Sequence, residues 1–134
     1  MSIAKEVDKV AKDLQRLVRM KAADKDGFCR CVSCGVLKHW KEMDGGHFIS
    51  RSKLATKLET TNVHPQCKRC NGFSTSTTVL DYRDYMVEMY GKEWVEWLRK
   101  ESQKIKKWTR HELLELHLEI KEQLKFQSKR LHGH

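Results

Sequence analysis

The stretches CVSCG at residues 31–35 and CKRCN at residues 67–71 decide the fold of this chain. Each stretch holds one Cys-x-x-Cys pair, and 32 residues separate the two pairs. A single pair is weak evidence of a metal site, but two pairs at this spacing can bring four thiolates around one ion. The sequence therefore predicts a tetrahedral, structural zinc site with the ligands Cys31, Cys34, Cys67 and Cys70.

The chain has a fifth cysteine, Cys29, which lies two residues before the first ligand. We expect Cys29 to be the spare, because the pair that begins at Cys31 and ends before Gly35 has the better knuckle pattern. The alternative is that Cys29 takes the place of Cys31 as a ligand. We expect a cytoplasmic protein, in which thiols stay reduced and paired cysteines favour metal over disulfides.

The length of 134 residues fits one small domain of the α+β class that is mostly α-helical. We expect four segments in that single domain: an N-terminal helix in residues 1–27, a zinc-containing core in 28–78, C-terminal helices in 79–127 and a frayed tail in 128–134. No run of apolar residues is long enough to span a membrane, and the first residues have no signal-peptide core.

Hydrophobic periodicity predicts the helices. Apolar residues recur at helical spacing over residues 3–23, over 80–90 and over 94–98. Gly91 suits the end of the second of these helices. The motif TRHE at 109–112 is typical of a capping box, so it predicts the start of a last helix.

Short strands and loops are expected in the core. We predict a turn at Gly45–Gly46, a strand over residues 47–49, and a second strand over 60–63 that Pro65 ends. Residues 74–78 read as a polar loop that leads into a helix cap.

The net charge of +9 favours a polyanionic partner. The excess lies in the predicted core, where residues 28–78 hold eight Lys or Arg against three Asp or Glu, while both flanks are nearly balanced. We therefore expect a nucleic-acid backbone to lie along the metal-site segment; the alternative, about equally favoured by composition alone, is an ordinary solvated basic surface.

Three residues near the cysteines suit the hydrolysis of a phosphodiester bond, which needs a base for water and a cation beside the leaving oxygen. His47 follows two glycines and can be the base, because its intrinsic pKa lies near neutrality. Asn71 offers an amide oxygen, which suits Mg²⁺ or Mn²⁺ as the catalytic ion. Asn62 is expected to bond the loop that carries His47 and so orient its ring.

Longer motifs around these residues resemble a known family. They are CVSCG at 31–35, MDGGHFISR at 43–51, NVHPQC at 62–67 and CN at 70–71. In this order they resemble the HNH endonucleases, in the HNN variant, and more closely the NinG (Rap) recombination proteins of lambdoid phages. The likeness extends over most of residues 14–125.

The resemblance implies a zinc-stabilised ββα-metal finger and a phage endonuclease for branched DNA, such as Holliday junctions and D-loops. It would act in the host cell's cytoplasm. By the same resemblance His47 is the general base, Asn62 orients it and Asn71 is a ligand of the catalytic cation.

The sequence departs from the broader HNH pattern at Gly46, where many of those enzymes carry a metal-binding side chain just before the base. Asp44 and His64 are the two candidates to replace that ligand. His64 is about equally well explained as a packed or hydrogen-bonded strand residue.

Four basic residues are the candidates for contacts with DNA phosphates: Arg51, Lys53, Lys68 and Arg69. Each is expected to position the backbone rather than to catalyse.

Two other functions stay open. The chain could be a non-catalytic zinc module that binds DNA or recruits recombination proteins, or a redox protein that uses its Cys-x-x-Cys pairs. The C-terminal helices could pack back onto the N-terminal helix or form a homodimer face, and a twofold dimer would place two sites on a junction.

Overall fold

A computed structural model describes all residues, 1–134. The chain is mostly helical, with two small antiparallel sheets, as predicted for its class. In chain order its elements are α1 (Ile3–Ala22), β1 (Phe28–Arg30), β2 (Leu37–His39), η1 (Trp40–Glu42), β3 (Met43–His47), α2 (Leu54–Lys57), η2 (Thr60–Asn62), β4 (Val63–Cys67), α3 (Lys68–Gly72), α4 (Ser76–Tyr90), α5 (Lys92–Ser102) and α6 (Arg110–Arg130).

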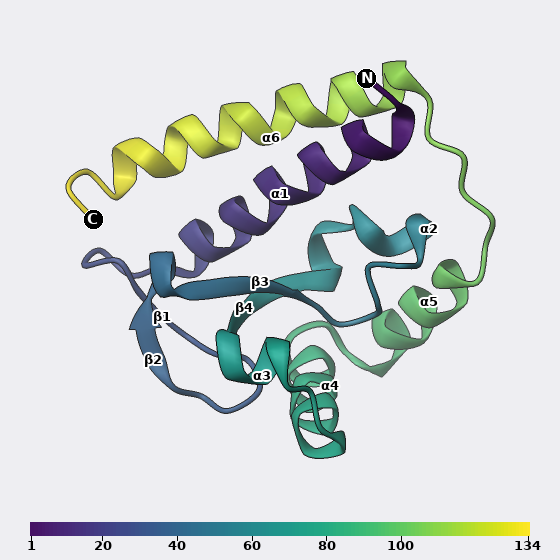
Figure 1. Cartoon of the computed structure of the whole chain (residues 1–134). Coiled ribbons are helices and arrows are strands. Elements are labelled where there is room, and N and C mark those ends of the chain that lie inside the picture. The colour runs from purple at the N-terminus through teal and green to yellow at the C-terminus, as the bar shows by residue number, and fades with distance from the viewer.

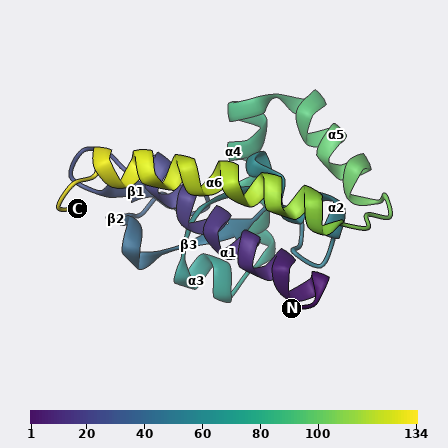
Figure 2. The same ribbon diagram turned by 90° about the horizontal axis from the view of Figure 1, so that it is seen from above.

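The two long helices α1 and α6 lie side by side, and α1 lies between α6 and the sheet of β3 and β4 (Figure 1). Seen from above, α6 runs along α1 (Figure 2). The helices α4 and α5 lie on the other side of that sheet, and β1 and β2 form a separate ribbon at one end. None of the helices combines the length and the apolar character that crossing a membrane requires.

Helix α1 confirms the predicted amphipathic pattern. Ser2 caps it by accepting a hydrogen bond from the Lys5 N–H. Its apolar stripe is buried against α6 and β4, in a core cluster that includes Leu14, Leu17 and Val63. Because this helix packs directly on β3 and β4, it forms one wall of the space beside β3.

Helix α6 begins at the predicted capping box, in which Thr109 and Glu112 bond each other's backbone N–H groups. The prediction that residues 128–134 fray is wrong. Leu131 is buried in the second core cluster, and the Arg130 guanidinium donates to the carbonyls of Met20 and Ala23 at 2.7 and 2.9 Å.

The first strand of the core lies earlier than predicted. Gly45 and Gly46 are inside β3, which ends at His47, so the predicted turn at the glycines and the strand over 47–49 are both wrong. The reason is packing: a Cβ at Gly45 would lie 2.6 Å from the Cβ of Gln15 in α1. Gly45 lets the helix approach the strand rather than letting the chain turn.

The second strand, β4, lies later than predicted, and Pro65 is in its middle rather than after its end. Residues 60–62 form the short η2 turn instead. The Pro65 carbonyl accepts from the Val32 N–H at 3.0 Å, outside the β3–β4 pair. Since the N and C=O of one strand residue point to the same side, the missing N–H costs no bond to β3.

Helix α4 begins at Ser76, one turn earlier than predicted, because Thr75 and Thr78 form a capping box. Gly91 separates α4 from α5 with a positive φ of 89°, as its predicted place at a helix end requires. The two helices share a third core cluster built on Tyr82, Met86 and Leu98.

Candidate functional site

The four predicted ligand cysteines meet in one cluster. The Sγ atoms of Cys31, Cys34, Cys67 and Cys70 all lie within 4.8 Å of one another, and those of Cys34 and Cys67 are 3.8 Å apart. Tetrahedral zinc with Zn–S bonds of about 2.3 Å requires sulfur atoms about 3.8 Å apart. The cluster could therefore hold a zinc ion with four thiolates and no open position.

Each half of the cluster is a knuckle in which a backbone N–H points at a sulfur. The Cys34 N–H donates to the Cys31 Sγ, and the Cys70 N–H donates to the Cys67 Sγ, both at 3.4 Å. Burial raises the pKa of Cys34, but bonds from the Val36 N–H and the neighbouring thiols outweigh it and lower that pKa to about 7. At Cys70, burial and the neighbouring cysteines raise the pKa, so in the absence of a metal the four sulfurs do not all ionise together.

Cys29 does not join the cluster, so the alternative in which it replaces Cys31 is wrong. It lies in β1, where burial raises the pKa of its thiol to about 11. Its side chain packs in the second core cluster.

Beside the cysteine cluster lies an open cavity of about 830 Å³ that follows β3 and is walled by α1, α3 and the start of α4. Of the residues predicted to act, those that line it are Asp44, His47, Arg51, Lys68 and Asn71. Those that do not are Lys53, Asn62, His64 and Arg69. The structure thus brings together residues that are up to 27 positions apart in the chain.

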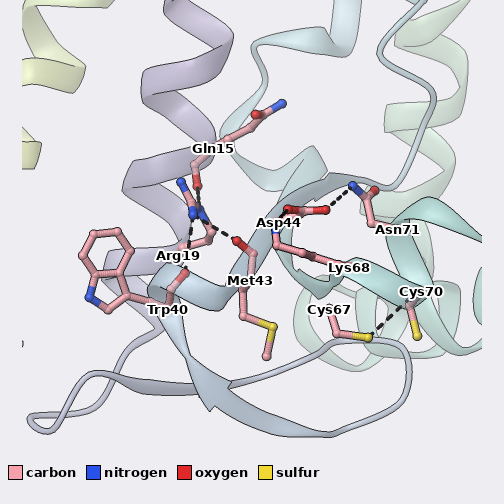
Figure 3. Close-up of polar contacts among 9 residues, drawn as sticks. All are labelled: Gln15, Arg19, Trp40, Met43, Asp44, Cys67, Lys68, Cys70 and Asn71. Carbon is pink, nitrogen blue, oxygen red and sulfur yellow. Dashed lines mark hydrogen bonds and ion pairs between the residues drawn. The ribbon is translucent and has the colours of Figure 1, made fainter.

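Asp44 is the acidic centre of the cavity. One carboxylate oxygen lies 2.7 Å from the Lys68 Nζ, and the other accepts from the Asn71 Nδ2 at 3.0 Å (Figure 3). Partial burial would raise the pKa of Asp44, but the bonds from Lys68 and Asn71, together with the charges of Lys68 and Arg19, lower it. The carboxylate is therefore charged at neutral pH. Asn71 uses its Nδ2 for the bond to Asp44, while its Oδ1 makes no hydrogen bond.

His47 is the last residue of β3, and its Nε2 lies 2.9 Å from the Lys57 carbonyl. A carbonyl can only accept, so Nε2 carries the proton and Nδ1 keeps its lone pair. Burial is the main cause that lowers the pKa of His47 below its usual value of 6.5, and the positive charges of Lys57 and Arg51 lower it further. The ring is therefore neutral at pH 7.

Asn62 is fully buried and holds the loop that follows His47. Its Oδ1 accepts from the Ile49 N–H at 2.8 Å, and its Nδ2 donates to the carbonyls of Ile49 and Thr56 at 3.0 and 3.2 Å. It bonds the backbone two residues after His47 and makes no bond to the imidazole itself.

His64 lies between two tyrosines. The Tyr82 hydroxyl donates its proton to the Gly46 carbonyl at 2.6 Å, so the His64 Nδ1 must donate to the Tyr82 oxygen at 3.2 Å. The His64 Nε2 then accepts from the Tyr90 hydroxyl at 2.7 Å. Burial lowers the pKa of His64 to about 4, in keeping with this neutral network. Both ring nitrogens are used, and neither faces the cavity.

The four predicted phosphate-binding residues take different places. Arg51 and Lys68 line the cavity, Lys53 is exposed just before α2, and Arg69 is exposed beside the cysteine cluster, where bonding to Cys34 raises the pKa of its guanidinium.

Two residues of α1 that line the cavity, Gln15 and Arg19, were not predicted from the sequence. Arg19 is half-buried and donates to the carbonyls of Gln15, Trp40 and Met43, which fixes the start of β3 (Figure 3). Gln15 lies one turn earlier on the same side of α1. The four-residue spacing places both on one helical face, but no pattern in the sequence indicated that this face meets Gly45 of β3.

Gln66, on β4, was also missed. Its place in the strand opposite Asp44 follows from a register that the sequence did not predict.

Comparison with known proteins relates these residues to a phage family. The family model described as "Bacteriophage Lambda NinG protein" matches residues 2–130. The curated "Protein ninG" of Salmonella phage P22 is 26% identical over 115 residues, which are 85% of this chain and 55% of that protein. The chain thus spans about half the length of the curated relative that it matches. No solved structure matches it.

Proposed function

The chain belongs to the NinG family of bacteriophage proteins, and on that premise we propose that it is a metal-dependent endonuclease that cuts branched recombination DNA in the host cytoplasm. The observation that carries the proposal is the meeting of Asp44 and Asn71 in a basic cavity that His47 also lines. A carboxylate, an amide and a neutral imidazole are the groups that a one-metal phosphodiesterase needs.

In this proposal β3, β4 and α3 are the ββα-metal finger of the HNN variant. The three elements follow that order, with His47 at the end of the first strand and Asn71 in the helix directly after Cys70. The zinc would be structural, because four thiolates leave no position for substrate. It would hold α3 against β4 and so keep Asn71 beside Asp44.

Asp44 and the Asn71 Oδ1 would hold the catalytic cation, Mg²⁺ or Mn²⁺, which both prefer oxygen ligands. Bound there, the ion would supply positive charge beside the leaving oxygen. Lys68 now neutralises Asp44 at 2.7 Å. If a metal took over as the partner of the carboxylate, the Lys68 ammonium would be free to bind a DNA phosphate.

His47 would be the general base. Its Nε2–H is held by the Lys57 carbonyl, so the unprotonated Nδ1 is the atom that takes a proton from water. Asn62 supports this geometry by fixing the backbone at Ile49. In-line attack of the activated water would leave a 5′-phosphate and a 3′-hydroxyl.

Basic residues around the cavity would position the DNA backbone. Arg51 and Lys68 lie in the cavity itself, while Lys53 and Arg69 are exposed outside it. Such contacts carry no sequence information, so the proposed selectivity is for the shape of a branch. A homodimer would place two such sites on the two strands of a junction.

A second candidate function is a non-catalytic zinc module that binds branched DNA or recruits recombination proteins. The observation that favours it is Gly46, which offers no ligand side chain just before His47.

One experiment separates the two functions. The zinc-loaded protein is incubated with a four-way DNA junction and with a linear duplex of the same sequence, each with Mg²⁺ and with EDTA. The endonuclease proposal expects strand cuts in the junction with Mg²⁺ only, and 5′-phosphate ends. Tight junction binding without any cut under either condition would support the binding module and reject the nuclease.

A further inference from the structure

The side chain of Gln66 occupies the space in front of Gly46. A Cβ on Gly46 would overlap the Oε1 atom of Gln66. In the β3–β4 register Gln66 is directly opposite Asp44, so these two side chains share one face of the sheet. The position that lacks a side chain on β3 is therefore filled by an amide from β4.

Hydrogen bonds fix which way this amide faces. The Gln66 Nε2 donates to the Ser33 Oγ at 3.0 Å, and the Ser33 hydroxyl uses its own proton on the Thr78 carbonyl at 3.1 Å. Ser33 can therefore only accept from Gln66, which assigns the nitrogen to the Ser33 side and the oxygen to the other side.

The Gln66 oxygen is an acceptor without a partner. The residue is only 6% exposed and lines the cavity, yet its Oε1 receives no hydrogen bond. No unpaired side-chain N or O atom is sealed from solvent, so solvent can reach this oxygen. Its lone pairs are therefore available to a water or a cation in the cavity that Gln66 lines.

We infer that the Gln66 Oε1 is a third oxygen ligand of the catalytic cation, in place of the side chain that Gly46 lacks. The inference rests on the proposed cation site at Asp44 and Asn71. Directly opposed strand residues have Cβ atoms about 5 Å apart, within the reach of a carboxylate and an amide that share one ion. Amide oxygens are hard ligands of the same kind as the Asn71 oxygen.

The inference explains why Gly46 and Gln66 occur together. Any side chain at position 46 would displace the Gln66 amide, so the site takes its ligand either from position 46 or from position 66. If Asp44, Gln66 and Asn71 are the ligands, position 46 must be glycine, because a side chain there would displace the Gln66 amide.

Binding of Mn²⁺ to the zinc-loaded protein without DNA tests the inference, with the free ion followed by electron paramagnetic resonance. We expect Gln66→Met, which keeps the volume and removes the oxygen, to weaken Mn²⁺ binding about tenfold or more. Gln66→Glu restores an oxygen and should bind Mn²⁺ at least as tightly as the wild type. Ser33→Ala keeps the oxygen and should stay closer to the wild type than Gln66→Met.

Asp44→Ala is the reference variant that tests the cation site separately from the role of Gln66. If Asp44→Ala loses Mn²⁺ while Gln66→Met binds it like the wild type, the role of Gln66 is wrong and the cation site stands. If neither variant changes Mn²⁺ binding, both the inference and the proposed cation site are wrong. Zinc content and the melting temperature are measured for each variant. If Gln66→Met loses either, the decision rests on zinc-loaded Gln66→Glu, whose failure to bind Mn²⁺ would overturn the inference.

Discussion

Gly45 sets how closely helix α1 approaches the candidate site. A Cβ there would lie 2.6 Å from the Cβ and 2.7 Å from the Cα of Gln15, so any side chain would push against helix backbone. This contact brings Gln15 and Arg19 to the cavity wall. A single missing side chain thus determines which helical residues surround Asp44.

We predict that Gly45→Ala lowers the free energy of unfolding by about 1–3 kcal/mol, because the added methyl overpacks the contact between α1 and β3. Gly72→Ala is the matched control, since a Cβ on Gly72 meets nothing within 4 Å and alanine favours its helix. Urea unfolding of both variants measures the effect. Equal stability of Gly45→Ala and the wild type would show that α1 does not pack this closely.

His64 makes stability depend on pH. Its pKa is about 4 in the folded chain, against 6.5 in its ordinary state, because burial disfavours the charged ring. Between these values the unfolded chain binds a proton that the folded chain does not, so stability falls as the pH drops from about 6.5 toward 4. Above about pH 7 the ring is neutral in both the folded and the unfolded chain, so His64 no longer lowers the free energy of unfolding.

We expect the loss between pH 7.5 and pH 5 to be about 2 kcal/mol larger in the wild type than in His64→Gln, which cannot titrate. Urea unfolding at the two pH values measures each loss, and the comparison cancels acid effects on the cysteine cluster that both proteins share. Equal losses in the two proteins would mean that His64 is not buried as a neutral ring.

Among the secondary-structure elements, the long helices were predictable, while the strands and the short helices α2 and α3 were not. In α1 and α6 the apolar positions and the capping residues are close together in the sequence. Interactions between near neighbours along the chain therefore specify these helices. The strands β3 and β4 contain two glycines and a proline, which ordinarily signal turns. They are strands because α1 packs on Gly45 and Val32 bonds Pro65, and both contacts come from distant segments.

The end of α6 shows the same limit. Nothing local in the last residues distinguishes a docked helix end from a frayed tail, and the buried Leu131 contacts a cluster that includes Met20 and Trp40.

We predict that Leu131→Ala destabilises the protein by about 2–4 kcal/mol, because it removes buried methyl groups and leaves a cavity. Leu114→Ala, in α6 at a residue that is 58% exposed, should change stability by less than about 0.5 kcal/mol. Thermal and urea unfolding of the two variants and the wild type measure these stability changes. Similar small effects for both would indicate that the chain end is not docked.

At the scale of the whole molecule, the cysteine cluster connects the loop after β1 to the β4–α3 junction. It therefore adds a metal-dependent cross-link to the second core cluster, in which Cys31, Cys67 and Cys70 pack with Met20 of α1. We expect Cys67→Ala to lose its zinc and to melt at a lower temperature, because the free energy of binding a structural metal contributes to the stability of the fold. Cys29→Ala is the control and should keep one zinc per chain. Stoichiometric zinc in Cys67→Ala, measured by elemental analysis, would contradict the four-cysteine site.

The candidate site was partly predictable at this scale. The spacing of the cysteines and the position of Asn71 after Cys70 indicated a metal frame, and Asp44 was one of two candidates for a further ligand. The contributions of Arg19 and Gln66 depend on how α1 and β4 pack on β3. No pattern of single residues carries that information.

The most direct measurement is the single-turnover rate at which zinc-loaded His47→Ala cuts a four-way junction with Mg²⁺. Removal of a general base predicts a rate at least about 100-fold below that of the wild type, with junction affinity and zinc content unchanged. His111→Ala, which changes an exposed histidine of α6, should cut at the wild-type rate. A His47→Ala protein that cuts as fast as the wild type would contradict the proposed nuclease site.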